Sequence, residues 1–235
     1  MIQAVILAGG LGTRLRPLTY EIPKVLVPIS GKPFLSYLIL MLAENGIDDI
    51  VICAGHLGEQ IVTSVGDGGE LGCKIRYSFE KELLDTGGAI KNALSLLDDE
   101  FLVLNGDTYH PIDYKKLVEF WHNRKAGYDC LIVGYENKDL IVPNNIRADK
   151  AGTVEEYSKK ELADGCCVDS GVQLFKKNVF NELPPNKRIS LEKDVFVSII
   201  RRGKMLSYIT GIRYYDIGTV ERIKAFEKYL QARKN

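Results

Sequence analysis

The stretch IQAVILAGGLGTRLRPLTYEIPK, residues 2–24, decides the fold of this chain. It begins with an apolar run at residues 2–8, which is typical of a buried strand, and continues into a glycine turn at residues 9–12. Two cations follow, Arg14 and, behind a proline, Lys24. A strand that ends in such a turn presents backbone N–H groups to an anion, and the cations add positive charge beside them. The segment is therefore predicted to bind the phosphates of a nucleoside triphosphate.

Other glycine-rich turns fit these residues less well. Glycines without a Cβ atom let the backbone adopt positive φ angles and lie directly against an anion. A Walker loop ends in Gly-Lys-Ser/Thr, and the chain has no such string. A dinucleotide fingerprint needs glycine at position 15, which is Leu15. A plain strand-to-helix turn without a ligand is the remaining alternative, and Arg14 with the Pro23-Lys24 pair favours phosphate binding over it.

The motif GGxGTR at residues 9–14, followed by Pro-Lys at 23–24, resembles the signature of the sugar-1-phosphate nucleotidyltransferases, also called nucleotide-sugar pyrophosphorylases. These enzymes join a nucleoside triphosphate to a sugar 1-phosphate and release pyrophosphate. The likeness covers essentially the whole chain in the expected order. It continues through Pro28, Gly31-Lys32-Pro33, EKELLDTGGAI at 80–90, NGD at 105–107, residues 168–175 and YDIGT at 215–219.

Strand-length apolar runs alternate with helical periodicity in the first half of the chain. This rhythm predicts an α/β fold with a mainly parallel sheet that is covered on both faces. The resemblance implies a three-layer, Rossmann-like, mixed but mostly parallel sheet of the nucleotide-diphospho-sugar transferase type. Strands are predicted at 2–8, 50–54, 74–79 and 101–104, and helices at 34–45, 58–65, 89–97 and 114–125.

The second half is richer in strands. We predict one domain over residues 1–235, with a nucleotide-binding half at about 1–127 and a sugar-binding half at about 128–235 that share the sheet. Strands are expected at 130–135, 153–157, 168–175, 206–210 and 213–217, and helices at 191–202 and 220–232.

The composition argues against several classes of protein. Lysine plus arginine equals aspartate plus glutamate, 31 each, so no global positive field attracts nucleic acid or an anionic membrane. No apolar run approaches the roughly 20 residues that span a bilayer, and five cysteines without a Cys-x-x-Cys pair predict neither a disulfide framework nor a zinc site. We expect a cytoplasmic protein without nucleic-acid or membrane partners. Its apolar helix faces are compatible with a homo-oligomer.

The reaction implied by the resemblance is mainly an electrostatic problem. A sugar 1-phosphate is a nucleophile near neutral pH because its second pKa is about 6, so no general base is needed. Two polyanions must approach while pyrophosphate leaves, which calls for cations, a metal and orientation. By resemblance, Arg14 grips the triphosphate, while Lys24 neutralises the α-phosphate and the incoming sugar phosphate. Arg14, Lys24 and Asp107 form the predicted catalytic set. The alternative for both cations is that they are ordinary solvated side chains on the surface.

Asp107 closes an apolar strand that ends in Gly-Asp. A carboxylate at the carboxyl end of a strand suits Mg²⁺, which prefers oxygen ligands and bridges substrate phosphates. The alternative is that Asp107 caps the following segment. The resemblance pairs Asp107 with Asp216 around the same ion, a pairing that sequence alone does not give. We predict Mg²⁺ as the cofactor.

The base pocket is predicted by resemblance. Thr86-Gly87-Gly88 is expected to precede a helix that starts near Ala89 and to approach the base closely. The resemblance implies that Glu80 and Gly88 line the base pocket. A glutamate can accept hydrogen bonds from the N1–H and N2–H₂ groups of guanine, a donor pair that uracil and thymine lack, so guanine is the expected base. Asp85 departs from the glycine that relatives commonly carry. The predicted nucleotide-binding residues are Ala8, Gly9, Gly10, Gly12, Thr13, Arg14, Glu80, Gly87 and Gly88.

The sugar side departs more from the family pattern. Residues 154–160 (VEEYSKK) resemble the strand whose Glu-Lys pair contacts the sugar and its phosphate. Lys160 matches the lysine, but Lys159 replaces the glutamate, for which Glu155, Glu156 or Glu161 are substitutes. Asp169 stands where asparagine is common, so it accepts but no longer donates a hydrogen bond. The predicted sugar-phosphate-binding residues are Lys24, Lys160, Asp169 and Gly171.

These features predict a Mg²⁺-dependent transfer of a nucleotidyl group from a nucleoside triphosphate to a sugar 1-phosphate. The segment at 80–90 and the ending at 213–219 look most like manno-heptose 1-phosphate or mannose 1-phosphate guanylyltransferases. Uridylyl, thymidylyl or cytidylyl transfer to another sugar 1-phosphate, or to a non-sugar phosphate such as phosphocholine, is the alternative. A nucleotide sensor without turnover would be expected to lack Arg14, Lys24 or a metal aspartate, and all are present.

Overall fold

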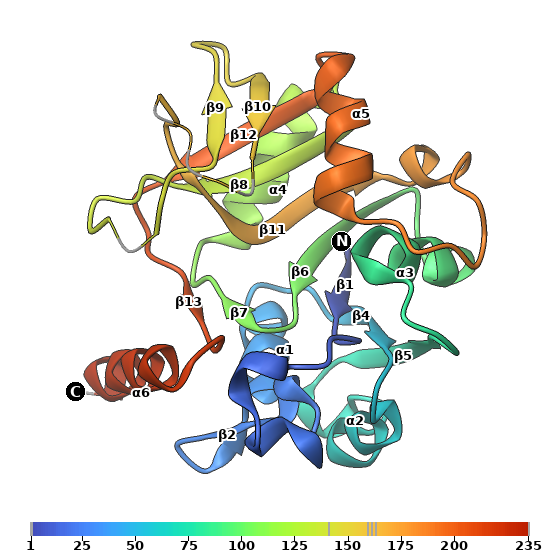
Figure 1. Ribbon diagram of the computed structural model, residues 1–235, viewed down its shortest axis with the longest axis vertical. Coiled ribbons are helices and arrows are strands. Elements are labelled where there is room, and N and C mark those ends of the chain that lie inside the picture. Colours follow the sequence, from blue (N-terminus) through green and yellow to red (C-terminus); the bar gives the residue numbers. More distant parts are fainter. Residues whose placement is uncertain (1, 141, 159, 161, 163, 235) are drawn as a thin grey trace.

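The computed structural model describes residues 2–140, 142–158, 160, 162 and 164–234. Seven strands form one twisted sheet in the order β12-β8-β11-β6-β1-β4-β5, which Figure 1 shows running through the centre of the molecule. Their bounds are β1 Gln3–Leu7, β4 Asp49–Ala54, β5 Lys74–Phe79, β6 Glu100–Asn105, β8 Cys130–Tyr135, β11 Val168–Lys176 and β12 Met205–Thr210.

The sheet is mostly parallel, as predicted. The pairs β1–β4, β1–β6, β4–β5 and β8–β12 are parallel, whereas β11 is antiparallel to both β6 and β8. The strands from the first half of the chain, β6-β1-β4-β5, lie side by side, and those from the second half continue the sheet beyond β6. The reversed strand β11 joins the two groups.

Helices cover both faces because successive side chains of a strand point to opposite sides. Ala4 and Ile6 of β1 belong to a core with α1, α2 and α4, whereas Val5 belongs to a second core with α3 and α5. The sheet is thus the middle of three layers. The helices are α1 Phe34–Glu44, α2 Gly58–Val65, α3 Asp85–Ala93, α4 Tyr114–Arg124, α5 Phe196–Arg201 and α6 Val220–Lys234.

The end of the chain returns to the first half. Strand β13 (Tyr215–Asp216) pairs with β7 (Thr108–Tyr109), which follows β6 directly. Helix α6 then lies near α1 (Figure 1), where the buried ring of Phe226 contacts Phe34 edge-on. This return carries residues far apart in sequence to one edge of the sheet.

Most predicted elements are present with bounds within one or two residues. Helix α3 is an exception, since it begins at Asp85 rather than near Ala89 and therefore contains the two glycines expected before it. The helix predicted at 191–202 is divided into a π-helical turn, η7 (Leu191–Val195), and α5. The sequence analysis missed the short strands β2 Pro28–Ile29, β3 Lys32–Pro33, β7 and β9 Ile146–Ala148, while it did predict the strand of β10, Val154–Tyr157.

A bilayer-spanning helix is absent from the described residues, where every helix is too short or too polar for that role.

Candidate active site

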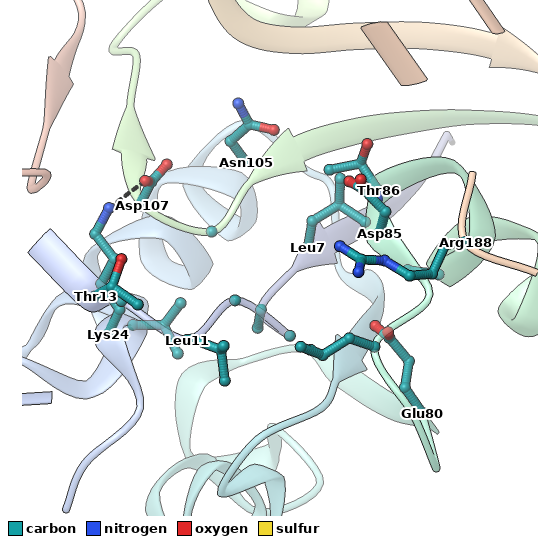
Figure 2. Close-up of a pocket in the computed structure, with 18 of the residues that line it drawn as sticks. Leu7, Leu11, Thr13, Lys24, Glu80, Asp85, Thr86, Asn105, Asp107 and Arg188 are labelled. Carbon is teal, nitrogen blue, oxygen red and sulfur yellow. Dashed lines mark hydrogen bonds and ion pairs between the residues drawn. The ribbon is translucent and has the colours of Figure 1, made fainter. Parts of the chain in front are cut away.

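A cavity of about 500 Å³ opens at the carboxyl ends of β1 and β6. In Figure 2, Lys24 and Asp107 lie on one side of it, and Glu80, Asp85, Thr86 and Arg188 lie on the other. The lining residues are Leu7, Ala8, Gly9, Gly10, Leu11, Gly12, Thr13, Lys24, Val25, Glu80, Leu83, Asp85, Thr86, Ala89, Asn105, Gly106, Asp107, Arg188 and Glu192.

The glycine turn lines the cavity between these two sides. At Gly10 an added Cβ atom would meet no other atom within 4 Å, so the backbone faces open space. Gly12 has a φ of +61°, a left-handed conformation that disfavours other residues. Thr19 donates from Oγ1 to the carbonyl of Gly12 at 2.8 Å and fixes the end of the turn. Ala8, Gly9, Gly10, Gly12 and Thr13, which the sequence analysis assigns to nucleotide binding, all line the cavity.

Lys24 and Asp107 form an ion pair at the cavity wall. Their side chains are 13% and 30% exposed, so each remains accessible from the cavity. Burial disfavours the charged form of Asp107, but the charge and hydrogen bond of Lys24, a hydrogen bond from Thr108 and the charge of Arg14 hold its pKa below the usual value. Asp107 is therefore an anion at neutral pH.

The return of the chain brings Asp216 close to Asp107. Asp216 is paired with Thr108 across β13 and β7, and the N–H of Ile217 donates to the carbonyl of Asp107 at 3.0 Å. Arg222 donates from Nη1 to both carboxylate oxygens of Asp216, at 2.8 and 3.0 Å. The two predicted metal ligands thus share one edge of the structure.

Arg14 lies at the same edge but outside the lining of the cavity. It is exposed, and its Nη1 would be 3.3 Å from a Cβ atom added to Gly218, which follows Asp216 by two residues. Its charge also contributes to the lowered pKa of Asp107. The predicted cations and carboxylates therefore form one cluster.

The donor set fits a divalent cation such as Mg²⁺. Such an ion takes one or two carboxylates from the protein and completes its shell with water and substrate phosphates. Asp107 lines the cavity, whereas Asp216 lies outside its lining, and each carboxylate is balanced by a cation, Lys24 or Arg222. In the described part of the chain no group of three or more His, Cys, Asp or Glu residues forms a complete metal cage. The site would depend on the substrate for its remaining ligands.

Glu80 lies on the opposite side of the cavity. Its Oε2 accepts a hydrogen bond from the N–H of Leu84 at 2.8 Å, and its Oε1 would be 2.7 Å from a Cβ atom added to Gly9. Burial raises its pKa, the Leu84 hydrogen bond lowers it, and the charge of Asp85 raises it, with a net upward shift. The carboxylate is thus held by one backbone hydrogen bond against the glycine turn.

Gly87 and Gly88 lie behind this wall rather than on it. Both are buried in α3, and their N–H groups donate to the carbonyl of Ile189 at 2.8 and 3.0 Å. A Cβ atom at Gly88 would be 2.5 Å from the carbonyl oxygen of Lys187, so these glycines allow close packing of the 187–189 segment. The residues of this turn that line the cavity are Asp85, Thr86 and Ala89.

Two further lining residues, Arg188 and Glu192, were missed by the sequence analysis. They come from the second half of the chain, and the N–H of Ile189 donates to the carbonyl of Leu84 at 2.9 Å to hold this segment against α3. No periodicity marks either residue. The only sequence signal for this segment is the pair Gly87 and Gly88, whose missing side chains leave the space that residues 187–189 occupy.

The predicted sugar-side residues are less concentrated. Lys160 is exposed and does not line the cavity, and Lys159 and Glu161 lie outside the described residues. Oδ1 of Asp169 accepts a hydrogen bond from the N–H of Gly171 at 2.8 Å. Gly171 in turn packs against Asn105, which lines the cavity. Asp169 and Gly171 therefore lie one layer behind the cavity wall.

The comparisons with known proteins agree with this geometry. Residues 3–232 match the Nucleotidyl transferase family. The D-glycero-alpha-D-manno-heptose 1-phosphate guanylyltransferase of Campylobacter jejuni is 35% identical over 220 residues, which cover 94% of this chain and 96% of that protein. The mannose-1-phosphate guanylyltransferase of Mycobacterium tuberculosis is 32% identical over 225 residues, and the match spans 94% of this chain but only 62% of that protein.

Solved structures of similar proteins share the fold over nearly the whole chain. HddC from Yersinia pseudotuberculosis has a TM-score of 0.86 and 32% identity, covering 98% of this chain and 100% of that one. The structure of HddC complexed with GMP-PN has a TM-score of 0.85 and 35% identity, covering 97% and 100%. The family match extends over nearly the whole chain, and the mostly parallel sheet is the one that the sequence predicted. The chain belongs to the nucleotidyl transferase family.

Proposed function

We propose that this protein transfers the guanylyl group of GTP to a manno-heptose or mannose 1-phosphate, giving a nucleotide-diphosphate sugar and pyrophosphate. One observation supports this most strongly: a single cavity joins the glycine turn and Lys24 on one side to Glu80 on the other. Phosphate-binding and base-reading groups are thus separated by a space of the size of a small-molecule site.

The chain's own residues account for the electrostatic part of the reaction. A phosphate oxygen of the sugar 1-phosphate attacks the α-phosphorus of GTP, and the bond to the bridging oxygen breaks as pyrophosphate leaves with its electron pair. Lys24 neutralises the two phosphates that approach each other, and Arg14 stabilises the departing pyrophosphate. The N–H groups of the glycine turn orient the triphosphate. No side chain has to remove a proton, because the attacking phosphate is already ionised.

The proposed cofactor is Mg²⁺, held by Asp107 and Asp216. When bound, the ion would neutralise phosphate charge and withdraw electrons from the phosphorus. In the free protein Lys24 and Arg222 balance the charge of these carboxylates. An ion held by Asp107 and Asp216 would take over this charge balance, so that Lys24 would be available to the phosphates.

Glu80 is the proposed guanine-reading residue. A carboxylate offers two acceptor oxygens, which match the adjacent N1–H and N2–H₂ donors of guanine. One oxygen of Glu80 is tied to Leu84 and the other lies beside Gly9, so its position is fixed before the base arrives. Thymine and uracil present one N–H donor between two carbonyls and do not satisfy this acceptor pair.

The test is a matrix of the four nucleoside triphosphates against a panel of sugar 1-phosphates, with Mg²⁺ present and pyrophosphate release as the readout. The panel includes mannose, manno-heptose and glucose 1-phosphates, together with phosphocholine. The proposal predicts the highest kcat/KM for GTP with mannose or manno-heptose 1-phosphate. Faster turnover with UTP or dTTP would overturn the guanine assignment, and CTP-only turnover with phosphocholine would overturn the sugar assignment.

A further inference from the structure

The wall of the cavity nearest the second half of the chain carries one carboxylate, Glu192. It lines the cavity and lies in η7, whose first turn is fixed by Ser190: Oγ of Ser190 accepts from the N–H of Lys193 at 3.3 Å. The N–H of Leu191 donates to Oγ1 of Thr86 at 2.9 Å. These bonds hold Glu192 against the base-side helix and fix its position in the wall.

Two of the glutamates considered for sugar contact, Glu155 and Glu156, lie outside the cavity lining. Glu155 and Glu156 both pair with Arg147, at 3.6 and 2.6 Å. Their side chains are 54% and 43% exposed, and neither lines the cavity. Glu161 lies outside the described residues. Among the described glutamates of the second half, Glu192 alone lines the cavity.

Tyr157 connects Glu192 to Asp169. Its hydroxyl donates to Oδ2 of Asp169 at 3.2 Å, and it also forms a hydrogen bond with Glu192. Burial and the negative charges of Asp169 and Glu192 raise the pKa of Tyr157, so its hydroxyl keeps its proton. Since that hydroxyl has one proton and two carboxylate neighbours, it donates to one of them at a time.

Further hydrogen-bond acceptors lie behind this wall, outside the lining of the cavity. Gln173 is 2% exposed and donates from Nε2 to Asp169 at 3.2 Å, while its Oε1 has no partner among the described residues. The carboxylate of Asp169 is a further acceptor. Asp169 and Glu192 share the single proton of Tyr157. A ligand that brings its own donors therefore suits Glu192, the carboxylate in the wall, and the hydroxyl groups of a sugar are such donors.

We propose that Glu192 accepts hydrogen bonds from hydroxyl groups of the sugar 1-phosphate, and that Tyr157 positions Glu192 for this contact. This inference rests on the proposed function. It moves sugar selection from the 154–160 strand, where sequence places it, to η7. Tyr157 remains a positioning residue, because it acts through Glu192.

The first test compares Glu192→Gln with Glu156→Gln in assays with GTP and mannose 1-phosphate. Glutamine keeps the size of the side chain but replaces one acceptor oxygen with a donor. A charged hydrogen bond is worth about 1.5–3 kcal/mol, so the KM for mannose 1-phosphate is expected to rise by roughly 10- to 100-fold in Glu192→Gln. The KM for GTP should stay within about twofold, and Glu156→Gln should behave as the wild type in both respects.

The second test measures kcat/KM of the wild type and of Glu192→Gln with the 2-, 3-, 4- and 6-deoxy analogues of mannose 1-phosphate. The hydroxyl that contacts Glu192 is the one whose removal lowers kcat/KM in the wild type but not in Glu192→Gln. Tyr157→Phe should raise the sugar KM in the wild-type background and add nothing in Glu192→Gln, which a merely structural role of Tyr157 would not produce.

Two failures are distinguishable. An active wild type with unchanged sugar kinetics in Glu192→Gln would overturn this inference and leave the proposed function standing. A wild type without pyrophosphate release on any sugar 1-phosphate would overturn the proposed function and this inference with it.

Discussion

The side of the cavity proposed to hold the phosphates and the side proposed to hold the sugar are built in different ways. The side proposed to hold the phosphates is lined by the consecutive residues 7–13 together with Lys24 and Val25, and its glycine turn exposes backbone. The side proposed to hold the sugar has Glu192 of a π-helical turn in the cavity wall, and Tyr157 of a short strand and Asp169 of the reversed strand lie behind it. A backbone site is encoded by a short motif, whereas a side-chain site depends on how distant segments pack.

This difference separates chemistry from selectivity. Changes on the phosphate side should reduce turnover with every substrate, because every nucleotidyl transfer involves the same phosphates. Changes on the sugar or base side should alter preference between substrates and spare the common chemistry. The following experiments test that division, in order of decreasing effect.

Asp107→Ala should have the largest effect. It removes a proposed metal ligand and the partner of Lys24, so kcat should fall on the order of 1,000-fold or more with all substrate pairs. The fold should survive, because the Asp107 side chain is 30% exposed at the cavity and is not part of either core. Steady-state pyrophosphate release and thermal unfolding would measure the two properties. The exposed Asp48 provides a control, as Asp48→Ala should leave both unchanged. A tenfold or smaller loss would place the metal elsewhere.

Lys24→Ala should follow closely. The loss of a cation that stabilises transition-state charge costs about 100- to 1,000-fold in kcat. The exposed Lys32 lies in β3 and does not line the cavity, so Lys32→Ala is a matched control. Comparable losses with GTP and UTP are expected. A loss confined to one nucleotide would contradict the assignment of Lys24 to the phosphate side.

Glu80→Gln should change preference rather than chemistry. We expect kcat/KM for GTP to fall by roughly 10- to 100-fold, since base-edge contacts of this kind are worth about 1–3 kcal/mol. The value for UTP should change by no more than about threefold. Glu82 is exposed and does not line the cavity, which makes Glu82→Gln the control. Equal losses with both nucleotides would mean that Glu80 does not read the base.

The pH dependence of stability should change by a smaller amount, and the direction of the change can be predicted. Burial lowers the pKa of His110 to about 4, with a hydrogen bond to the Ile212 carbonyl opposing the shift. Between pH 6.5 and about 4 the unfolded chain binds this proton and the folded chain does not, so stability falls as pH falls, by up to about 3 kcal/mol. Denaturant titrations between pH 6.5 and about 4 would measure the free energy of unfolding, and in His110→Gln the fall in stability due to this group should be absent.

Asp169 should act in the opposite direction. Burial, and to a lesser degree the charge of Glu192, raises its pKa to about 6 against hydrogen bonds from Gly171, Tyr157 and Gln173. The folded chain keeps this proton between pH 3.8 and about 6, so the contribution of Asp169 to stability is lost as pH rises through that window. Relative to the wild type, Asp169→Asn should therefore gain stability as pH rises from about 4 to 6. This account would be contradicted if the two variants, His110→Gln and Asp169→Asn, changed the pH dependence of the free energy of unfolding in the same direction relative to the wild type.

The sequence predicts the sheet well because its signals are local. Buried strands such as β1 and β4 are apolar runs of the right length, and the glycine turn marks the carboxyl end of the first strand. Alternation with helices then predicts parallel pairing. The reversed direction of β11 has no local signal, since strand periodicity is the same in either direction.

The site is predictable only in part, for the same reason. Asp107 follows a strand and a glycine, but its proximity to Asp216 depends on the pairing of β7 with β13, two strands of two residues each. Gly87 and Gly88 suggest a backbone approach to a ligand, whereas they accommodate the 187–189 segment that carries Arg188. A glycine reveals that something comes close and does not reveal what it is.

The central claim is that the open space above the glycine turn holds the triphosphate, and Gly10 permits a direct measurement. An added Cβ atom there meets nothing within 4 Å and Gly10 is not among the glycines with positive φ, so Gly10→Ala and Gly10→Val should fold normally, with Tm within about 2 °C of the wild type. The account predicts graded loss of GTP affinity by calorimetry, at least about tenfold for valine, because its methyl groups occupy the ligand's space. A Gly10→Val protein that binds GTP as tightly as the wild type would contradict it.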